Sequence, residues 1–204
     1  MIKKTDRVEK TSSVFFMLFL CYNEDMKSNT TEKIIHEIPP VWNAESRVLI
    51  LGTIPSPKSR EAGFFYMHPQ NRFWRVLPAI FGETLLTLNN DSDREKAIEE
   101  RKSFLIRHNI ALWDVLSSCD MYGAADSSIK NAVANDFEPL FSASKIHNVF
   151  CTGKAAFSLW QKLCAAKYES QYGLSVSLLP STSPANASWS IDKLIEEYRK
   201  ILVY

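Results

Sequence analysis

The chain has 204 residues, of which 46% are hydrophobic and 23% are charged. These values are typical of one globular domain with a sizeable core, and they exclude a disordered chain. The formal net charge is only +1. Any nucleic-acid partner must therefore be bound by a local basic surface, because the chain as a whole is not a polycation.

The first 29 residues are predicted to be a flexible extension, with residues 30–204 forming a single domain. Within the extension an apolar run, Val14–Tyr22, follows four basic residues, but it is too short to span a bilayer. A signal peptide is the alternative, although Asn23–Asp25 stand where a small-residue cleavage site belongs. Met26 comes next, which favours an extension ahead of the true start.

Four apolar, β-branched runs predict strands: Arg47–Leu51, Ile110–Trp113, Ile146–Cys151 and Leu174–Leu179. The first is followed by a loop and by an aromatic helix that begins near Asn71, and a charged amphipathic helix, Asp93–His108, leads into the second. A further helix opens at Gly153 and runs through Ala166. The last helix spans Trp189–Leu202, with Ser188 as its N-cap. Turn-rich loops are predicted at Asn89–Ser92 and Tyr122–Ser128.

Continuous apolar strands that alternate with helices indicate a parallel sheet covered on both faces. The predicted fold class is therefore α/β, a three-layer α/β/α sandwich with a central four-stranded parallel sheet. Ligands bind such sheets at the carboxyl ends of the strands. The segments that leave the four strands read GTIPSPKS, DVLSSC, TGKAAF and PSTSPAN, and we expect them to share one rim.

The segment Gly52–Trp74 is the densest cluster of aromatic and turn-forming residues. One interpretation is that its aromatic side chains simply belong to the core, because large rings are usually buried. The other is that a loop stiffened by prolines lies beside an aromatic platform, which is what stacking on an extruded base requires.

The cysteines and histidines are scattered and show no metal-binding spacing. We expect reduced thiols, no metal and no cofactor. Gly153-Lys154 follows a strand, but it lacks the rest of a P-loop, since Ala155 replaces the Ser or Thr. Lys154 is instead a candidate for contact with a DNA phosphate.

The motifs GTIPSPKS with YMHPQNRFW, LWDVLSSC, DSSIKNAVANDF, TGKAAF and LPSTSPANA occur in this order from about Arg47 onward. Through these motifs and their order, the chain resembles the hypoxanthine-DNA (DNA-deoxyinosine) glycosylases, a branch of the uracil-DNA glycosylase superfamily. The resemblance implies the fold described above. It also implies a hydrolase of base excision repair that acts on DNA, double-stranded or also single-stranded, as an intracellular, cytoplasmic monomer (nucleoid-associated in a prokaryote).

The resemblance assigns the catalytic role to Asn71, the asparagine of the HPxN motif. In much of the superfamily the water-positioning residue is an Asp or Asn at the place of Ile54, which cannot do this. An amide cannot take a proton at neutral pH, but it can orient a water and present its lone pair. Orientation is sufficient when the glycosidic bond breaks first, through an oxocarbenium-like transition state.

The departing base then needs hydrogen-bond donors, which we expect from backbone N–H groups of the turn Gly52–Ser56. The predicted substrate-binding residues are Gly52, Thr53, Pro55, Ser56, Tyr66, His68 and Asp114. His68 either donates to the base or is bonded to the backbone at a helix start. Asp114 either accepts the N1–H of hypoxanthine, which adenine lacks, or caps the turn Val115–Ser118.

The resemblance implies that the loop Pro180–Asn186 grips phosphates through Ser181 and Ser183 and wedges the duplex with its tip, Thr182–Asn186. The alternative is a plain turn between strand and helix. Leu179 stands where many relatives have a histidine that binds a base carbonyl. The predicted DNA-binding residues are Ser59, Lys154, Ser181, Thr182, Ser183 and Asn186.

Without a lysine placed for a Schiff base, we predict a monofunctional DNA glycosylase for a deaminated base, hypoxanthine in the first place. The alternatives are a uracil or mismatch-uracil glycosylase and an inactive nucleic-acid-binding module of the same fold.

Overall fold

The computed structural model describes residues 31–87, 93–123 and 125–203. The predicted extension with its run Val14–Tyr22, and the whole of the predicted turn Asn89–Ser92, lie outside these residues. Within the described ranges, no helix has the length and apolar character needed to cross a membrane.

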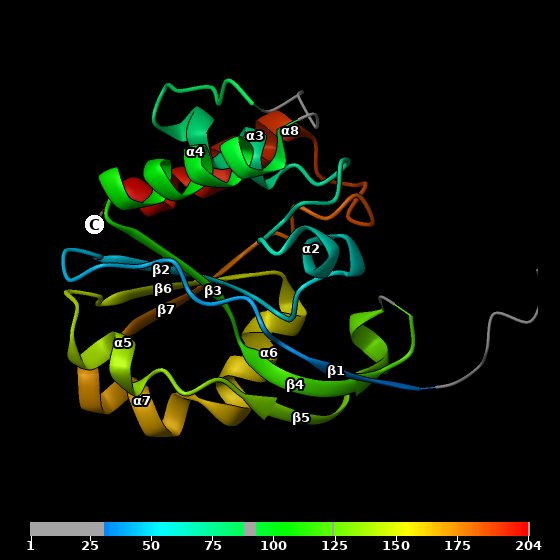
Figure 1. Ribbon diagram of the computed structural model, residues 1–204. Coiled ribbons are helices and arrows are strands. Elements are labelled where there is room, and N and C mark those ends of the chain that lie inside the picture. The colour runs from blue at the N-terminus through cyan, green and yellow to red at the C-terminus, as the bar shows by residue number, and fades with distance from the viewer. Residues whose placement is uncertain (1–30, 88–92, 124, 204) are drawn as a thin grey trace, which may run out of the picture.

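A four-stranded parallel sheet forms the centre of the molecule, as predicted. Its strands lie in the order β3-β2-β6-β7, with bounds β2 Val48–Gly52, β3 Ile110–Asp114, β6 Asn148–Thr152 and β7 Ser175–Leu179. Helices cover both faces (Figure 1): α3 Phe73–Ile80, α4 Arg94–Arg107 and α8 Ile191–Tyr198 on one, and α5 Glu138–Ser142, α6 Lys154–Leu163 and α7 Ala165–Tyr172 on the other. The short α2, Pro57–Ala62, follows β2. The predicted three-layer α/β/α fold is confirmed.

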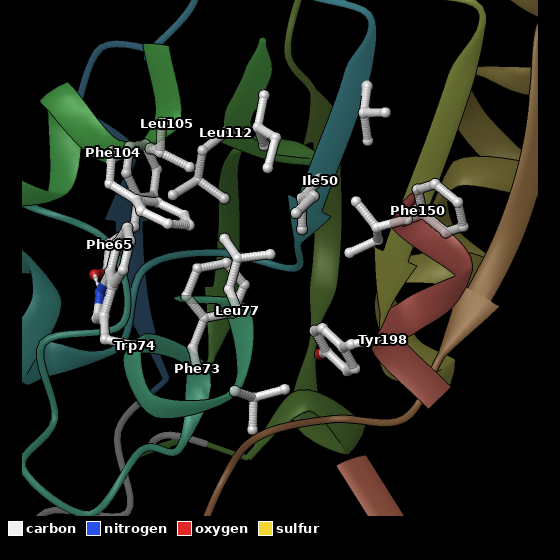
Figure 2. Packing of buried hydrophobic residues seen from close by; sticks show 14 of the residues in the cluster. Ile50, Phe65, Phe73, Trp74, Leu77, Phe104, Leu105, Leu112, Phe150 and Tyr198 are labelled. Atoms are coloured by element: carbon white, nitrogen blue, oxygen red, sulfur yellow. Dashed lines mark hydrogen bonds between the residues drawn. The ribbon is translucent and has the colours of Figure 1, made fainter. Parts of the chain in front are cut away.

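Alternate residues of each strand face opposite helical layers, which explains why all five residues of β2 are buried. Ile50, Leu112 and Phe150 lie on one face and pack with Tyr198 of α8 (Figure 2). Leu49 and its neighbours on the other face belong to a second cluster. These two apolar clusters hold the strand ends, and so the rim, in a fixed arrangement.

The last predicted helix, Trp189–Leu202, is shorter in the structure: α8 spans Ile191–Tyr198 and is followed by a 3₁₀ turn, Arg199–Val203. Two further details differ from the prediction. The N-cap of α8 is Ser190, whose side chain accepts a hydrogen bond from the Lys193 N–H, and Ser188 was wrongly assigned to this role. The helix expected from Gly153 through Ala166 ends at Leu163, because Cys164 leaves the helical conformation before α7 begins.

A second sheet was not predicted. It is antiparallel, in the order β1-β4-β5, with bounds β1 Glu32–Ile35, β4 Leu116–Met121 and β5 Lys130–Ala134. Only Val115 separates β3 from β4, so the chain passes directly from the parallel sheet into the antiparallel one. In the small sheet, His36 follows β1, and a 3₁₀ turn, Asp126–Ser128, lies between β4 and β5. His36 and Asp126, which belong to the candidate site described below, therefore come from a sheet that the sequence did not reveal.

Candidate active site

A cavity of about 480 Å³ lies where the carboxyl ends of all four parallel strands meet. This volume lies within the roughly 300–1,000 Å³ of small-molecule sites. The expected shared rim is present, and Asn71 lines the same cavity. The side chains and backbone that line it include Gly52, Thr53, Ile54, Pro55, Ser56, Ser59, Phe65, Tyr66, Asn71, Asp114, Asp126, Thr152, Ser181, Thr182, Ser183 and Asn186.

Asn71 is held by two hydrogen bonds to its side-chain oxygen. Oδ1 accepts from the backbone N–H of Phe73 at 3.0 Å and from the hydroxyl of Thr182 at 2.8 Å. An amide oxygen has two lone pairs, so both are occupied. The expectation that Asn71 presents a carbonyl lone pair to water does not agree with this geometry. Its Nδ2 amino group remains to hold a molecule in the cavity.

Arg72 fixes the loop that follows β7, a role that the sequence reading missed. Its guanidinium donates to the carbonyls of Thr182 (3.2 Å), Ser183 (2.8 Å), Asn186 (3.0 Å) and Trp189. The planar fork of arginine suits several acceptors at once. The only signal in the sequence was the position of this arginine, directly after the HPxN motif.

Asp114 is a buried carboxylate, 4% exposed, whose two oxygens have different surroundings. Oδ2 lies 3.0 Å from Nε2 of His36. Oδ1 lies beside Gly52, where an added Cβ would come within 2.2 Å of it. Burial raises the pKa of Asp114, and the hydrogen bond from His36 partly offsets this effect.

Asp114 does not cap the turn after it. The backbone N–H of Val115 donates to the carbonyl of Gly52, and the N–H of Leu116 donates to that of Thr53. The residues expected to form a turn instead enter strand β4. Of the two interpretations of Asp114, capping of a turn is therefore excluded, while its carboxylate lines the cavity.

Tyr66 contributes a hydroxyl whose proton points away from Asp114. Thr152 Oγ1 donates to the carbonyl of Leu51 at 3.1 Å, so it must accept the 2.8 Å hydrogen bond from Tyr66 Oη. Burial first, and then the charge of Asp114, raise the pKa of Tyr66 well above its usual value. The ring stacks on Phe73 with centroids 4.0 Å apart. Tyr66 thus stays a neutral phenol with oxygen lone pairs available in the cavity.

Tyr66 adopts a left-handed backbone conformation, with φ at 56°. Such a conformation is strained for an aromatic residue and is found most often where a site needs a side chain in one particular position. The other rings of the aromatic segment belong mainly to the core: Phe64, Phe73 and Trp74 are at most 3% exposed. Only Phe65 and Tyr66 of the expected platform line the cavity.

Asp126 is a second carboxylate of the cavity and was not predicted. Its Oδ2 accepts a 3.4 Å hydrogen bond from the Thr53 hydroxyl. Burial raises the pKa of Asp126, the bond from Thr53 opposes this, and the nearby charge of Asp114 adds to the increase. The DSSI segment was noticed, but its position over the cavity depends on the antiparallel sheet.

Three predicted residues lie elsewhere than expected. His68 does not line the cavity; its Nδ1 accepts from the backbone N–H of Gln70, as in the backbone-bonded interpretation. Ser59 is 2% exposed and bonds to Ser56 and Met67, which places it too deep for a phosphate contact. Thr182 is 1% exposed and binds Asn71, so it is not part of a protruding tip.

The remaining DNA-binding candidates lie around the mouth of the cavity or near it. Ser181 Oγ accepts from the Ser183 N–H, and Asn186 Nδ2 donates to the Ser181 carbonyl. Lys154 is exposed at the first turn of α6. The residue before it, Gly153, has φ of 101°, and an added Cβ there would come within 3.2 Å of the Ser181 Cβ. This close approach sets the loop beside the start of α6.

Among the residues that the structure describes, no three His, Cys, Asp or Glu side chains gather in a way that could hold a metal ion. The cavity instead offers two carboxylates, a phenol, hydroxyl groups and the primary amides of Asn71 and Asn186. These groups can orient water and bind the hydrogen-bonding edge of a base, and the carboxylates can stabilise a positively charged sugar.

Comparison with known proteins identifies the family to which the chain is similar. Residues 39–202 match the family model described as the uracil DNA glycosylase superfamily. A hypoxanthine DNA glycosylase of Methanosarcina barkeri is 34% identical over 140 residues, covering 68% of this chain and 84% of the relative. One of Methanosarcina acetivorans is 31% identical over 153 residues, covering 74% and 88%.

The fold agrees as well. A solution NMR structure from Methanosarcina acetivorans, described as a candidate uracil DNA glycosylase, superposes with a TM-score of 0.63 at 27% identity, covering 82% of this chain and 98% of that one. Since the family model spans most of the chain, this protein belongs to the uracil DNA glycosylase superfamily.

Proposed function

We propose that this DNA glycosylase is monofunctional and hydrolyses the N-glycosidic bond of hypoxanthine in double-stranded DNA, acting as a monomer. The observation that carries the proposal is the carboxylate of Asp114. One of its oxygens is bound to His36 and the other lies beside Gly52 in the cavity. An acceptor fixed in this way suits the N1–H of hypoxanthine and leaves adenine, whose N1 is an acceptor, without a partner.

The names of the two Methanosarcina relatives support the same substrate. Asp114 serves recognition in this proposal rather than stabilisation of the departing base, because both carry negative charge. Donors to the base come instead from backbone N–H groups of the segment Gly52–Ser56, which lines the cavity.

The water is held by two groups in this proposal. The Nδ2 amino group of Asn71 donates to its oxygen, because Oδ1 is already occupied. The carboxylate of Asp126 accepts a hydrogen from it, and the charge on Asp126 favours the cationic sugar of an oxocarbenium-like transition state. Phe65 and Tyr66 form the wall against which the everted base lies.

A uracil glycosylase is the second candidate, because uracil also presents an N–H that an acceptor such as Asp114 can bind. Two residues argue against it within the family resemblance. Ile54 occupies the place of the superfamily's water-positioning Asp or Asn, and Leu179 occupies the place of the histidine that binds a carbonyl.

The test is an excision assay on duplexes that carry hypoxanthine, xanthine, uracil or a mismatched thymine. We expect hypoxanthine to be released fastest, with an intact abasic strand until alkali is added. Asn71→Ala should reduce the rate by on the order of 100-fold or more with an unchanged circular dichroism spectrum. Release of uracil but not hypoxanthine would refute the substrate, and full activity of Asn71→Ala would refute the role of Asn71.

A further inference from the structure

The imidazole of His36 is fully enclosed, with a side chain that is 0% exposed. Its ring lies 6.0 Å from the ring of Phe65 and 6.4 Å from that of Trp113, measured between centroids. The backbone N–H of His36 donates to the carbonyl of Ser117 at 2.8 Å, which ties it to the start of β4. The ring therefore has one position, directly behind Asp114.

The two ring nitrogens of His36 have different partners, and these partners define its protonation. Nδ1 accepts a hydrogen bond from the backbone N–H of Ile38 at 3.2 Å, so Nδ1 carries no proton. Nε2 lies 3.0 Å from Oδ2 of Asp114 and must carry the proton of a neutral ring. His36 thus donates to Asp114 without neutralising its charge.

We infer that His36 is a positioning residue for base recognition, acting through Asp114; this inference rests on the proposed function. By occupying Oδ2 it turns Oδ1 toward the cavity. The backbone of Asp114 is fixed as well, since its carbonyl accepts from Asn135 Nδ2 at 2.9 Å. Because both the side chain and the backbone of Asp114 are fixed, its carboxylate presents one acceptor oxygen at one place. Recognition of a single N–H donor on the base requires this.

His36 also keeps that acceptor charged at lower pH. The titratable groups that face Asp114 are His36, Tyr66 and Asp126. Tyr66 and Asp126 cannot favour its charged form, since one is a neutral phenol and the other an anion. Loss of the donor from His36 should therefore raise the pKa of Asp114. Activity falls as the pH drops through that pKa, so the low-pH limb of kcat/KM should move to higher pH.

Three variants test this role. His36→Phe keeps an aromatic ring and removes the donor, His36→Gln supplies a side-chain N–H at a similar reach, and His108→Phe is the matched control. His108 pairs with Glu83 at 2.7 Å, outside the cavity. All three are compared with the wild type in single-turnover excision of hypoxanthine across pH and in a ¹³C NMR titration of the Asp114 carboxyl group without DNA.

We expect His36→Phe to lower kcat/KM at neutral pH on the order of 10- to 100-fold, as for loss of one hydrogen bond to a charged group. It should also shift both the low-pH limb and the Asp114 titration upward. His36→Gln should restore most of the rate and the original limb, and His108→Phe should change neither. ¹⁵N NMR of His36 in the wild type should show a protonated Nε2 and an unprotonated Nδ1.

Equal losses in His36→Phe and His36→Gln at every pH, with an unmoved Asp114 titration, would overturn the inference and leave a purely structural histidine. A protonated Nδ1 would overturn it too. If the wild type released no hypoxanthine, the proposed function would fail by itself, because the NMR titration measures the coupling of His36 to Asp114 without any substrate.

Discussion

Gly52→Ala should abolish most of the activity through a single added methyl group. The new Cβ would lie 2.2 Å from Asp114 Oδ1 and 2.9 Å from Tyr66 Oη. Contacts of about 3.3–3.6 Å are normal for carbon and oxygen, so the carboxylate has to retreat by about 1 Å. A displacement of this size at a reacting site costs roughly 100-fold in rate, which corresponds to about 2.7 kcal/mol.

The protein should still fold, since overpacking of this kind costs about 1–3 kcal/mol of unfolding free energy. The assay is kcat/KM for release of hypoxanthine from a duplex, with thermal unfolding measured on the same samples. Gly82→Ala is the control: Gly82 has φ of 72° and open space around it, so alanine there costs stability without touching the cavity.

A double-variant cycle isolates the cause. In an Asp114→Ala background the carboxylate is gone, and Gly52→Ala should then cost much less than it does in the wild type. Wild-type activity of Gly52→Ala, or an equal additional loss in the Asp114→Ala background, would refute the idea that the glycine exists to make room for this carboxylate.

Three further results are expected. Arg72→Ala removes charged hydrogen bonds to four carbonyls. One such bond contributes roughly 1.5–3 kcal/mol net, and water can reach these part-buried carbonyls in the variant, so we expect a total loss of about 3 kcal/mol in urea unfolding. Arg72→Lys, which lacks the planar fork, should not restore it; an unchanged unfolding midpoint would contradict this. Asp126→Asn should slow the chemical step on the order of 100-fold. Burial raises the pKa of Asp126, so wild-type kcat should fall as the pH drops through the pKa of this carboxyl group, and the variant should lose this low-pH fall in kcat. Burial raises the pKa of Cys151 and of Cys164 to about 12, so neither should react with iodoacetamide at about pH 8 until the protein is unfolded, as read by mass spectrometry; labelling of the native protein would show that these thiols are accessible.

The parallel sheet was predictable because its signal is local. β2 is a continuous apolar run that is buried along its whole length, and even β7, whose sequence SVSLL includes two serines, ends in a pair of leucines. The carboxyl-end rule then placed four separate loops at one rim without any knowledge of the contacts between them. Gly52 and Asp114 could be placed at the cavity for that reason, whereas Asn71 was placed by the family resemblance.

The antiparallel sheet could not be read in the same way. β5 has the sequence KNAVA and is mostly exposed, and β1 pairs with residues almost ninety positions away, Glu32 with Met121. Pairing over such a separation leaves no local pattern. A lone histidine such as His36 carries no motif either, and its role follows only from the carboxylate that faces it.

Asn71 and Arg72 are neighbours in the chain, and both reach across to the segment after β7, through Thr182 and through four carbonyls up to Trp189. Under the proposed function, a DNA duplex that displaces this segment also displaces the Asn71 amide, because Thr182 is hydrogen-bonded to it. In that proposal, binding of the DNA backbone and positioning of the water are coupled through the same loop. Substitutions at the outer end of the loop should accordingly change the rate of bond cleavage as well as the affinity for DNA.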